Sequence, residues 1–192
     1  MPLFIRAPWL GAAHAGARFR ELVELVDVYP TVAALAGVPL PTGESYAVDG
    51  RSLASLLAGN GAPRAYEAYE PRAAALQVFP RCLTPGDPNW GPTKWPQDTC
   101  LNVERSAFTL MGFAMRTDRY RYTEWRRWNG TSLSAESWDD AAYARELYDH
   151  EGDTGPWTDP DKFEIRNEVA GAPTALLASL AAQLRALVAA HG

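Results

Sequence analysis

Histidine, cysteine and lysine, which supply many catalytic and metal-binding side chains, are rare in this sequence. Its 192 residues include three histidines, two cysteines and two lysines. The histidines are His14, His150 and His191. None forms a ligand pair at metal spacing, so we expect three solvated surface groups. Asp149, Glu151 and Asp153 alternate but lack the glycine and glutamate pattern of a calcium loop, which predicts a solvated acidic turn and no metal site in this chain.

Basic residues and long apolar runs are also scarce. The formal net charge is -5, whereas a phosphate backbone attracts a basic stripe, so we expect no nucleic-acid partner. No apolar run approaches the ~20 residues that span a bilayer, so we expect no membrane span. The first ten residues lack the basic-then-apolar plan of a signal peptide.

The residues that are present indicate a globular chain, since 47% are hydrophobic and 21% are charged. The opening stretch Pro2 to Pro8 has the composition of an interior strand closed by a proline, and a chain that opens in this way is expected to be a fragment. Val28 to Ala36 is predicted to be a helix, with Asp27 as its N-cap and Gly37 as its C-cap.

Further elements follow from turn residues and periodicity. Ser52 is a candidate cap for a short helix that runs through Leu57. Ala73 to Phe79 is predicted to be a strand that ends at Pro80. The alanine- and leucine-rich stretch Thr174 to Ala190 carries leucines at helical spacing and predicts a closing helix.

A hairpin is predicted at Met111 to Trp125. Two β-favouring, aromatic-rich runs flank the turn residues Thr117, Asp118 and Arg119. One face of the first arm is apolar and the other is mixed, because successive side chains point to opposite faces. We therefore expect a hairpin that is half buried on something larger.

Cys82 and Cys100 enclose a stretch dense in proline, tryptophan and glycine. One disulfide would restrict the unfolded state of such a loop by roughly 3 kcal/mol. We expect this disulfide and an oxidising compartment, with two unrelated thiols as the alternative. Asn129-Gly130-Thr131 is a glycosylation sequon, which becomes meaningful if the chain is secreted.

The amino-acid sequence of several segments resembles the C-terminal region of sulfatases. The resemblance is strongest to the iduronate-2-sulfatase group within the alkaline-phosphatase-like superfamily. These segments are the hairpin, Glu24 to Pro39, Asp49-Gly-Arg-Ser-Leu53, and Glu146-Leu-Tyr-Asp149 followed by Arg166-Asn167. They occur in the same order as in that family, and together they cover nearly the whole chain.

The resemblance implies an α/β fold with a small antiparallel sheet of about four strands, packed with a long C-terminal helix. An N-terminal strand and helix would belong to the large catalytic sheet. Residues 1–60 would then be the end of the catalytic domain, and residues 61–192 the C-terminal subdomain.

Sulfatases use a formylglycine made from cysteine in a Cys-x-Pro/Ala-x-Arg motif, beside a calcium ion. Cys82-Leu-Thr-Pro-Gly and Cys100-Leu-Asn-Val-Glu both fail this motif. The resemblance therefore implies no catalytic residue and no cofactor in this chain. Formylglycine and calcium are implied for a missing N-terminal catalytic half of a secreted or lysosomal enzyme.

One candidate binding segment remains. Gln77-Val-Phe79-Pro80-Arg81 resembles a Ser-Gln-Tyr-Pro-Arg stretch that borders the active-site pocket of the iduronate-2-sulfatase group. Arg81 is the candidate for binding a uronate, because its planar fork suits a carboxylate. Gln77, Phe79 and Pro80 complete the predicted substrate-binding set. The order of residues differs from the family and Phe79 lacks the tyrosine hydroxyl; the alternative for Arg81 is a surface salt bridge.

Three functions compete on this basis. The first is the C-terminal portion of a sulfuric ester hydrolase that recognises a sulfated, uronate-containing saccharide in glycosaminoglycan degradation. The second is a catalytically dead domain that binds acidic or sulfated glycans through Arg81 and the surfaces of Trp90, Trp95 and Trp128. The third is part of a related phosphodiesterase.

Overall fold

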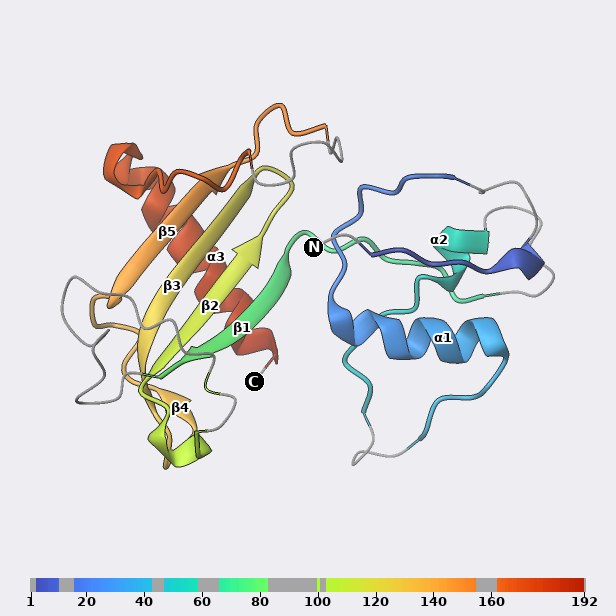
Figure 1. Cartoon of the computed structure of the whole chain (residues 1–192), viewed down its shortest axis with the longest axis horizontal. Helices are drawn as coiled ribbons and strands as arrows, with labels where there is room; N and C mark the ends of the chain where they lie inside the picture. Colours follow the sequence, from blue (N-terminus) through green and yellow to red (C-terminus); the bar gives the residue numbers. More distant parts are fainter. Residues whose placement is uncertain are drawn as a thin grey trace. The chain divides into compact units, whose positions relative to one another are not determined.

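A computed structural model describes residues 3–10, 16–42, 47–58, 66–82, 100, 103–154 and 162–191. The chain divides into two compact units, Met1–Ala73 and Ala74–Gly192 (Figure 1). The expected boundary after residue 60, between the end of a catalytic domain and a C-terminal subdomain, stays a prediction.

The first unit contains short helical elements. They are the 3₁₀ helices Pro8–Leu10 and Leu25–Asp27, α1 (Val28–Ala36) and α2 (Ala54–Ala58). Helix α1 has the predicted bounds and ends at Gly37, whose φ of 71° is left-handed and suits glycine. Ser52 caps the short helix as predicted, since its Oγ accepts the Ala54 N–H at 3.2 Å.

The predicted opening strand is not formed in the described residues. Residues 3–7 have no regular secondary structure, and a 3₁₀ turn follows them. A strand needs a neighbour to accept and donate its ladder hydrogen bonds, and no described segment pairs with residues 3–7. Membership of this stretch in a larger sheet stays a prediction.

Asp27 is the N-cap residue of α1, as the sequence predicts, but its backbone is helical and its side chain makes no capping hydrogen bond to that helix. Instead the fully buried carboxylate accepts the backbone N–H groups of Glu24 at 2.8 Å and Arg51 at 2.7 Å, and both of its oxygens accept from the Arg72 guanidinium. Burial raises the pKa of Asp27, but these hydrogen bonds, led by that of Arg72, lower it overall.

The second unit is built on an antiparallel sheet. Its strands are β1 (Ala75–Arg81), β2 (Leu110–Arg116), β3 (Tyr120–Asn129), β4 (Ser134–Ala135) and β5 (Ala144–Asp149). The main sheet has the order β1-β2-β3-β5, and β4 pairs only with the end of β3. The four-stranded main sheet confirms the predicted fold class. Strand β1 runs through Pro80 instead of ending there, because an edge strand can lack one N–H donor.

The predicted hairpin forms between β2 and β3. Arg116 pairs with Arg121 at its closed end. Thr117 closes the turn, since its N–H donates to the Tyr120 carbonyl at 2.8 Å and its Oγ1 accepts the Tyr120 N–H at 2.9 Å. The turn residues therefore do what the sequence predicts for them.

Helix α3 (Thr174–His191) covers one face of this sheet and creates the core (Figure 1). The buried residues of the core are Met111, Phe113, Met115, Tyr122, Leu147, Leu180 and Leu184. Leu176, Leu177 and Leu187 pack around them, whereas Gln183 and Arg185 are exposed. The predicted leucine stripe of the closing helix is confirmed.

The hairpin is more deeply buried than predicted. Every β2 residue from Leu110 to Met115 is buried, so both faces of this strand are covered. On the α3 face, a charged group also lies in the core: Glu124 is 1% exposed and accepts from the Tyr122 hydroxyl at 2.7 Å and from Arg126 Nε at 2.9 Å. Arg126 donates in turn to the Asp140 carbonyl at 2.6 Å, which ties the chain after β4 to the sheet.

The outer edge of β5 is occupied by the segment before α3. Asn167 Oδ1 accepts the Leu147 N–H at 3.1 Å, Asn167 Nδ2 donates to the Arg145 carbonyl at 3.0 Å, and the Glu168 N–H donates to the Leu147 carbonyl at 2.8 Å. These bonds satisfy part of an edge that would otherwise face water unpaired.

By length and composition alone, α3 could cross a membrane, which is weak evidence. The contacts of Leu180 and Leu184 with the sheet are those of a core helix. The expected absence of a membrane span stays a prediction.

We predict that Asp27→Asn destabilises the first unit by about 3 kcal/mol, because it leaves the buried Arg72 guanidinium short of a counter-charge. Amide hydrogen exchange in α1 measures this loss. The matched control is Asp139→Asn, which removes an exposed ion pair with Arg185 and should cost less than about 1 kcal/mol.

The same carboxylate predicts a pH dependence. The pKa of Asp27 in the folded chain lies below its ordinary value of 3.8, so its stabilisation is complete above that pH. The stabilisation is lost as the pH falls through the lower, folded pKa. If Asp27→Asn and Asp139→Asn reduced the hydrogen-exchange protection of α1 equally, the stabilising role of the Asp27 carboxylate would be contradicted.

Candidate functional site

The predicted binding residues lie on β1, at one edge of the sheet. Gln77, Phe79 and Arg81 share the face of the sheet opposite α3, because side chains alternate and Leu76 packs in the α3 core. Pro80 points to the other face. The structure therefore brings three of the four predicted residues to one surface, of which Gln77 is exposed and Phe79 and Arg81 are half-buried.

A row of paired residues crosses the sheet next to Arg81. Phe79 pairs with Gly112 on β2, and Gly112 pairs with Trp125 on β3. A Cβ at Gly112 would lie 2.7 Å from Trp125 Cζ3, so the indole lies directly over the glycine. The missing side chain at Gly112 lets the ring of Trp125 extend across β2 towards β1.

The Arg81 guanidinium lies against both aromatic rings of this row. Its Cζ is 5.0 Å from the Phe79 ring centroid and 5.8 Å from that of Trp125. Such cation-π contacts stabilise by roughly 0.5–1 kcal/mol each at exposed sites. No ion pair joins Arg81 to a carboxylate among the residues that the structure describes, so the alternative of a surface salt bridge finds no support there.

Trp125 is held from its other side by β5. Its Nε1–H donates to Glu146 Oε1 at 2.7 Å, and the Tyr148 hydroxyl donates to Glu146 Oε2 at 3.0 Å. Burial, with the nearby Glu146 carboxylate, raises the pKa of Tyr148 to about 12. The hydroxyl therefore stays a donor at physiological pH and the orientation of Glu146 is maintained.

The predicted disulfide is present between Cys82 and Cys100. Cys82 follows directly after Arg81 and is buried, as is Cys100. The bond therefore fixes the end of β1 at the residue next to the candidate binding arginine. Both cysteines of the chain are in this bond, so neither offers a thiol.

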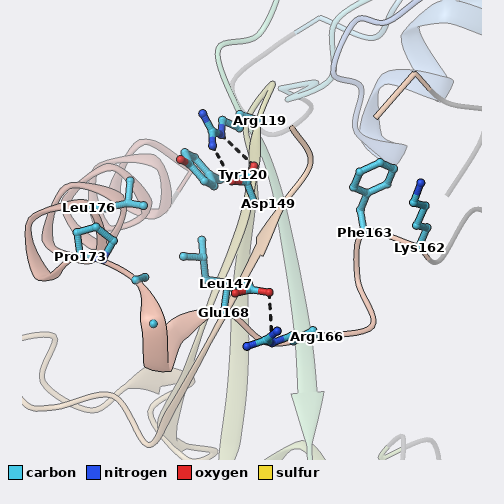
Figure 2. A pocket seen from close by; sticks show the side chains of 12 residues that line it. Arg119, Tyr120, Leu147, Asp149, Lys162, Phe163, Arg166, Glu168, Pro173 and Leu176 are labelled. Atoms are coloured by element: carbon cyan, nitrogen blue, oxygen red, sulfur yellow. Dashed lines mark hydrogen bonds and ion pairs between the residues drawn. The ribbon is translucent and has the colours of Figure 1, made fainter. Parts of the chain in front are cut away.

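A cavity of about 590 Å³ lies at the other edge of the sheet (Figure 2). It is lined by Arg119, Tyr120, Leu147, Asp149, Lys162, Phe163, Arg166, Glu168, Gly171, Ala172, Pro173 and Leu176. Arg119 pairs with Asp149 at 2.7 Å and Arg166 with Glu168 at 3.5 Å, as the dashed lines show. These internal pairs offset most of the charge, and the cavity contains none of the residues predicted to bind substrate.

The acidic turn after β5 is solvent-exposed, as predicted, and it is also ion-paired: the Glu151 side chain is 71% exposed and that of Asp149 33%. Asp149 and Glu151 both contact the Arg119 guanidinium, which lowers the pKa of Asp149. The prediction of a solvated His150 is wrong, because its side chain is 8% exposed, with Nδ1 2.9 Å from Asp153 and Nε2 3.2 Å from Glu164.

The predicted glycosylation sequon and Trp128 lie within the described residues. Asn129 is exposed, and its Oδ1 accepts the Thr131 N–H at 2.9 Å, so the sequon lies in a turn at the surface. Trp128 is partly buried against the core, with its ring centroid 6.4 Å from that of Phe113, so it lies on the α3 face and not beside Arg81. Trp90 and Trp95 lie outside the described residues. No group of three or more potential metal-binding side chains occurs in the described part of the chain.

No protein-family model matches the chain. Iduronate 2-sulfatase from Mus musculus is 32% identical to it over 143 residues, which are 70% of this chain and 24% of that protein. The chain is a sulfatase-like C-terminal portion. This result confirms the resemblance that its segments indicate.

Two solved structures are also similar to the sulfatase-like chain. They are a Bacteroides thetaiotaomicron VPI-5482 protein classed among the sulfatases and a 2-O GAG sulfatase, with TM-scores of 0.43 and 0.42. Each is 20% identical and covers 86% of this chain and 23% of the other. The chain thus spans about a quarter of the length of the proteins that it matches.

The sequence indicates Arg81 as a candidate, which stays a prediction, and it does not indicate the residues that surround Arg81 in the structure. Trp125 was assigned to the hairpin only, and Gly112 and Glu146 had no role. One signal was available: a glycine inside an apolar strand often marks a close approach by another group. The side chain that covers the glycine depends on the register of the paired strands, which the local sequence does not determine.

We predict that the double variant Cys82→Ser/Cys100→Ser destabilises the second unit by about 3 kcal/mol, because the unfolded chain regains the freedom of a loop of 18 residues. Urea unfolding followed by tryptophan fluorescence measures the change. The wild-type chain in reductant should show the same loss. If the double variant were as stable as the oxidised wild-type chain, a structural role for the disulfide would be contradicted.

Proposed function

We propose that this chain is the C-terminal part of a sulfuric ester hydrolase, in which it recognises a sulfated, uronate-containing saccharide. Its similarity to a mouse iduronate 2-sulfatase supports the hydrolase class. Arg81 would bind the uronate carboxylate, and the substrate would be a glycosaminoglycan or a related polymer.

The observation that carries the binding role is the position of the Arg81 guanidinium over two aromatic rings. Contact with Phe79 and Trp125 restricts the side chain through ring faces, and among the described residues no carboxylate pairs with its guanidinium. A guanidinium that keeps its planar fork free can accept a carboxylate through two parallel hydrogen bonds. Apolar ring faces beside the cation also suit the C–H surface of a sugar.

The chemical step would belong to a catalytic half outside this chain. Both cysteines are in the disulfide, and the described residues hold no cluster fit for a metal. The proposal therefore assigns formylglycine and calcium to that other half. Such a half would also cover the exposed apolar residues of the first unit, which include Phe4, Leu25, Tyr29 and Val32.

The proposed compartment is extracellular or lysosomal. The disulfide favours an oxidising environment during folding, and the exposed Asn129 sequon is accessible to a glycosyltransferase.

Two other functions stay open. A catalytically dead domain could bind acidic glycans through the same Arg81 surface, although Trp128 no longer supports it. A related phosphodiesterase would share this unit but would carry a threonine or serine nucleophile. Transcript sequence upstream of the Met1 codon separates the three: the proposal expects an open frame with a Cys-x-Pro/Ala-x-Arg motif, and an in-frame stop would contradict it.

We predict that Arg81→Gln weakens binding of a heparin-derived tetrasaccharide to the 192-residue chain by roughly tenfold or more, because a hydrogen bond to a charged group contributes ~1.5–3 kcal/mol. Isothermal titration calorimetry measures the change. The loss should shrink when the uronate carboxylates of the probe are reduced to alcohols, since their partner is then already absent.

The matched control is Arg185→Gln on α3. It removes the same charge from the helix that covers the opposite face of the sheet, where Arg185 is exposed beside Asp139. It should weaken binding less than about twofold through the lost long-range attraction. Equal losses of affinity in the two variants would refute uronate recognition by Arg81. So would a loss in Arg81→Gln that is the same for the native and the carboxyl-reduced saccharide.

A further inference from the structure

We propose that Gly112, Trp125 and Glu146 are positioning residues for Arg81, and that they fix the direction of its guanidinium by holding the Trp125 indole flat across the sheet. This inference rests on the proposed function for its effect on binding. Its effect on the geometry of Arg81 can be measured without any ligand.

First, the arrangement requires a glycine at position 112 on β2. Gly112 lies between Phe79 and Trp125 in the strand register. Any Cβ at this position would meet Trp125 Cζ3 at 2.7 Å and Cη2 at 2.9 Å, closer than Cβ atoms approach other atoms in folded proteins. Only glycine therefore permits the indole to cover β2 and reach the space beside β1.

The second step is the anchor on β5. Trp125 is buried, so packing restricts its indole, and a directional hydrogen bond on its far side selects one orientation. Glu146 accepts the Trp125 Nε1–H at 2.7 Å, and the Tyr148 hydroxyl holds the second Glu146 oxygen at 3.0 Å. A charge-assisted hydrogen bond of this kind is strong and directional. The ring plane is thus set from β5.

The third step is the contact with Arg81. The cation lies 5.8 Å from the ring centroid of Trp125 and 5.0 Å from that of Phe79. Two rings restrict the guanidinium more than one ring would, because each favours the cation over its own face. A rotated Trp125 leaves Arg81 with Phe79 alone, and an anionic ligand must then order the side chain as it binds, which costs affinity.

The decisive comparison is Glu146→Ala against Glu146→Gln. Glutamine keeps one carbonyl oxygen that can accept the Trp125 Nε1–H, and its amide NH2 can donate to the Tyr148 hydroxyl oxygen, whereas alanine keeps neither contact. Both changes remove the same negative charge. If Glu146 acted through charge alone, each would strengthen the binding of an anionic saccharide. Positioning predicts the opposite for alanine: affinity for the heparin-derived tetrasaccharide falls about fivefold, the range expected for one lost hydrogen bond.

The ligand-free readout is the NMR resonance of Arg81 Nε–Hε, assigned by its loss in Arg81→Lys. Ring currents of two aromatic faces should shift this proton away from its position in free arginine. Glu146→Ala should move it back, and Glu146→Gln should retain the native shift. Gly112→Ala should act like Glu146→Ala. Native methyl resonances of Leu180 and Leu184 show that each variant keeps its core, and Glu151→Ala is the charge-matched control.

The outcomes separate the two proposals. An Arg81 resonance that does not move in Glu146→Ala overturns the positioning role, whatever the saccharide does. A resonance that moves, in a chain whose affinity is unaffected by Arg81→Gln, supports positioning and overturns uronate recognition. Equal affinities of Glu146→Ala and Glu146→Gln, with Arg81→Gln defective, show that Arg81 binds without this support and overturn the inference.

Discussion

The second unit depends on the burial of the β2–β3 hairpin on both of its faces. Helix α3 covers one face with a leucine stripe, and the large side chains of the strands themselves cover much of the other, with the Trp125 indole lying over Gly112. A hairpin alone is marginally stable in water. Its register is therefore set by what must be buried, and that register decides which residues stand beside Arg81.

Elements whose cause is local could be predicted from the sequence. The bounds of α1, the turn at Thr117, the leucine stripe of α3 and the disulfide all follow from residues a few positions apart or from pattern and composition. The error at Pro80 shows the limit of such reasoning: a proline interrupts a central strand but not an edge strand. Whether a strand lies at an edge is a property of the whole sheet.

Side-chain partners that are distant in the chain could not be predicted. Asp27 is bonded to a backbone 24 residues away and to a guanidinium 45 residues away, so its position as N-cap of α1 could be predicted while the partners of its carboxylate could not. Trp125 and Glu146 are 21 residues apart. A buried acid must find donors wherever the fold provides them. The sequence predicted Arg81 through its resemblance to sulfatases, but the support for Arg81 appears only when the strands are paired.

The two edges of the main sheet bear on how the protein behaves at high concentration. Asn167 and Glu168 occupy the outer side of β5, and β1 carries Pro80, which has no N–H to offer a further strand. An incoming β-strand from another molecule finds neither edge fully open, which is how natural sheets avoid growing into fibrils. Self-association of the isolated chain should therefore proceed through the apolar surface of residues 1–73, and it should yield amorphous material with little added cross-β structure.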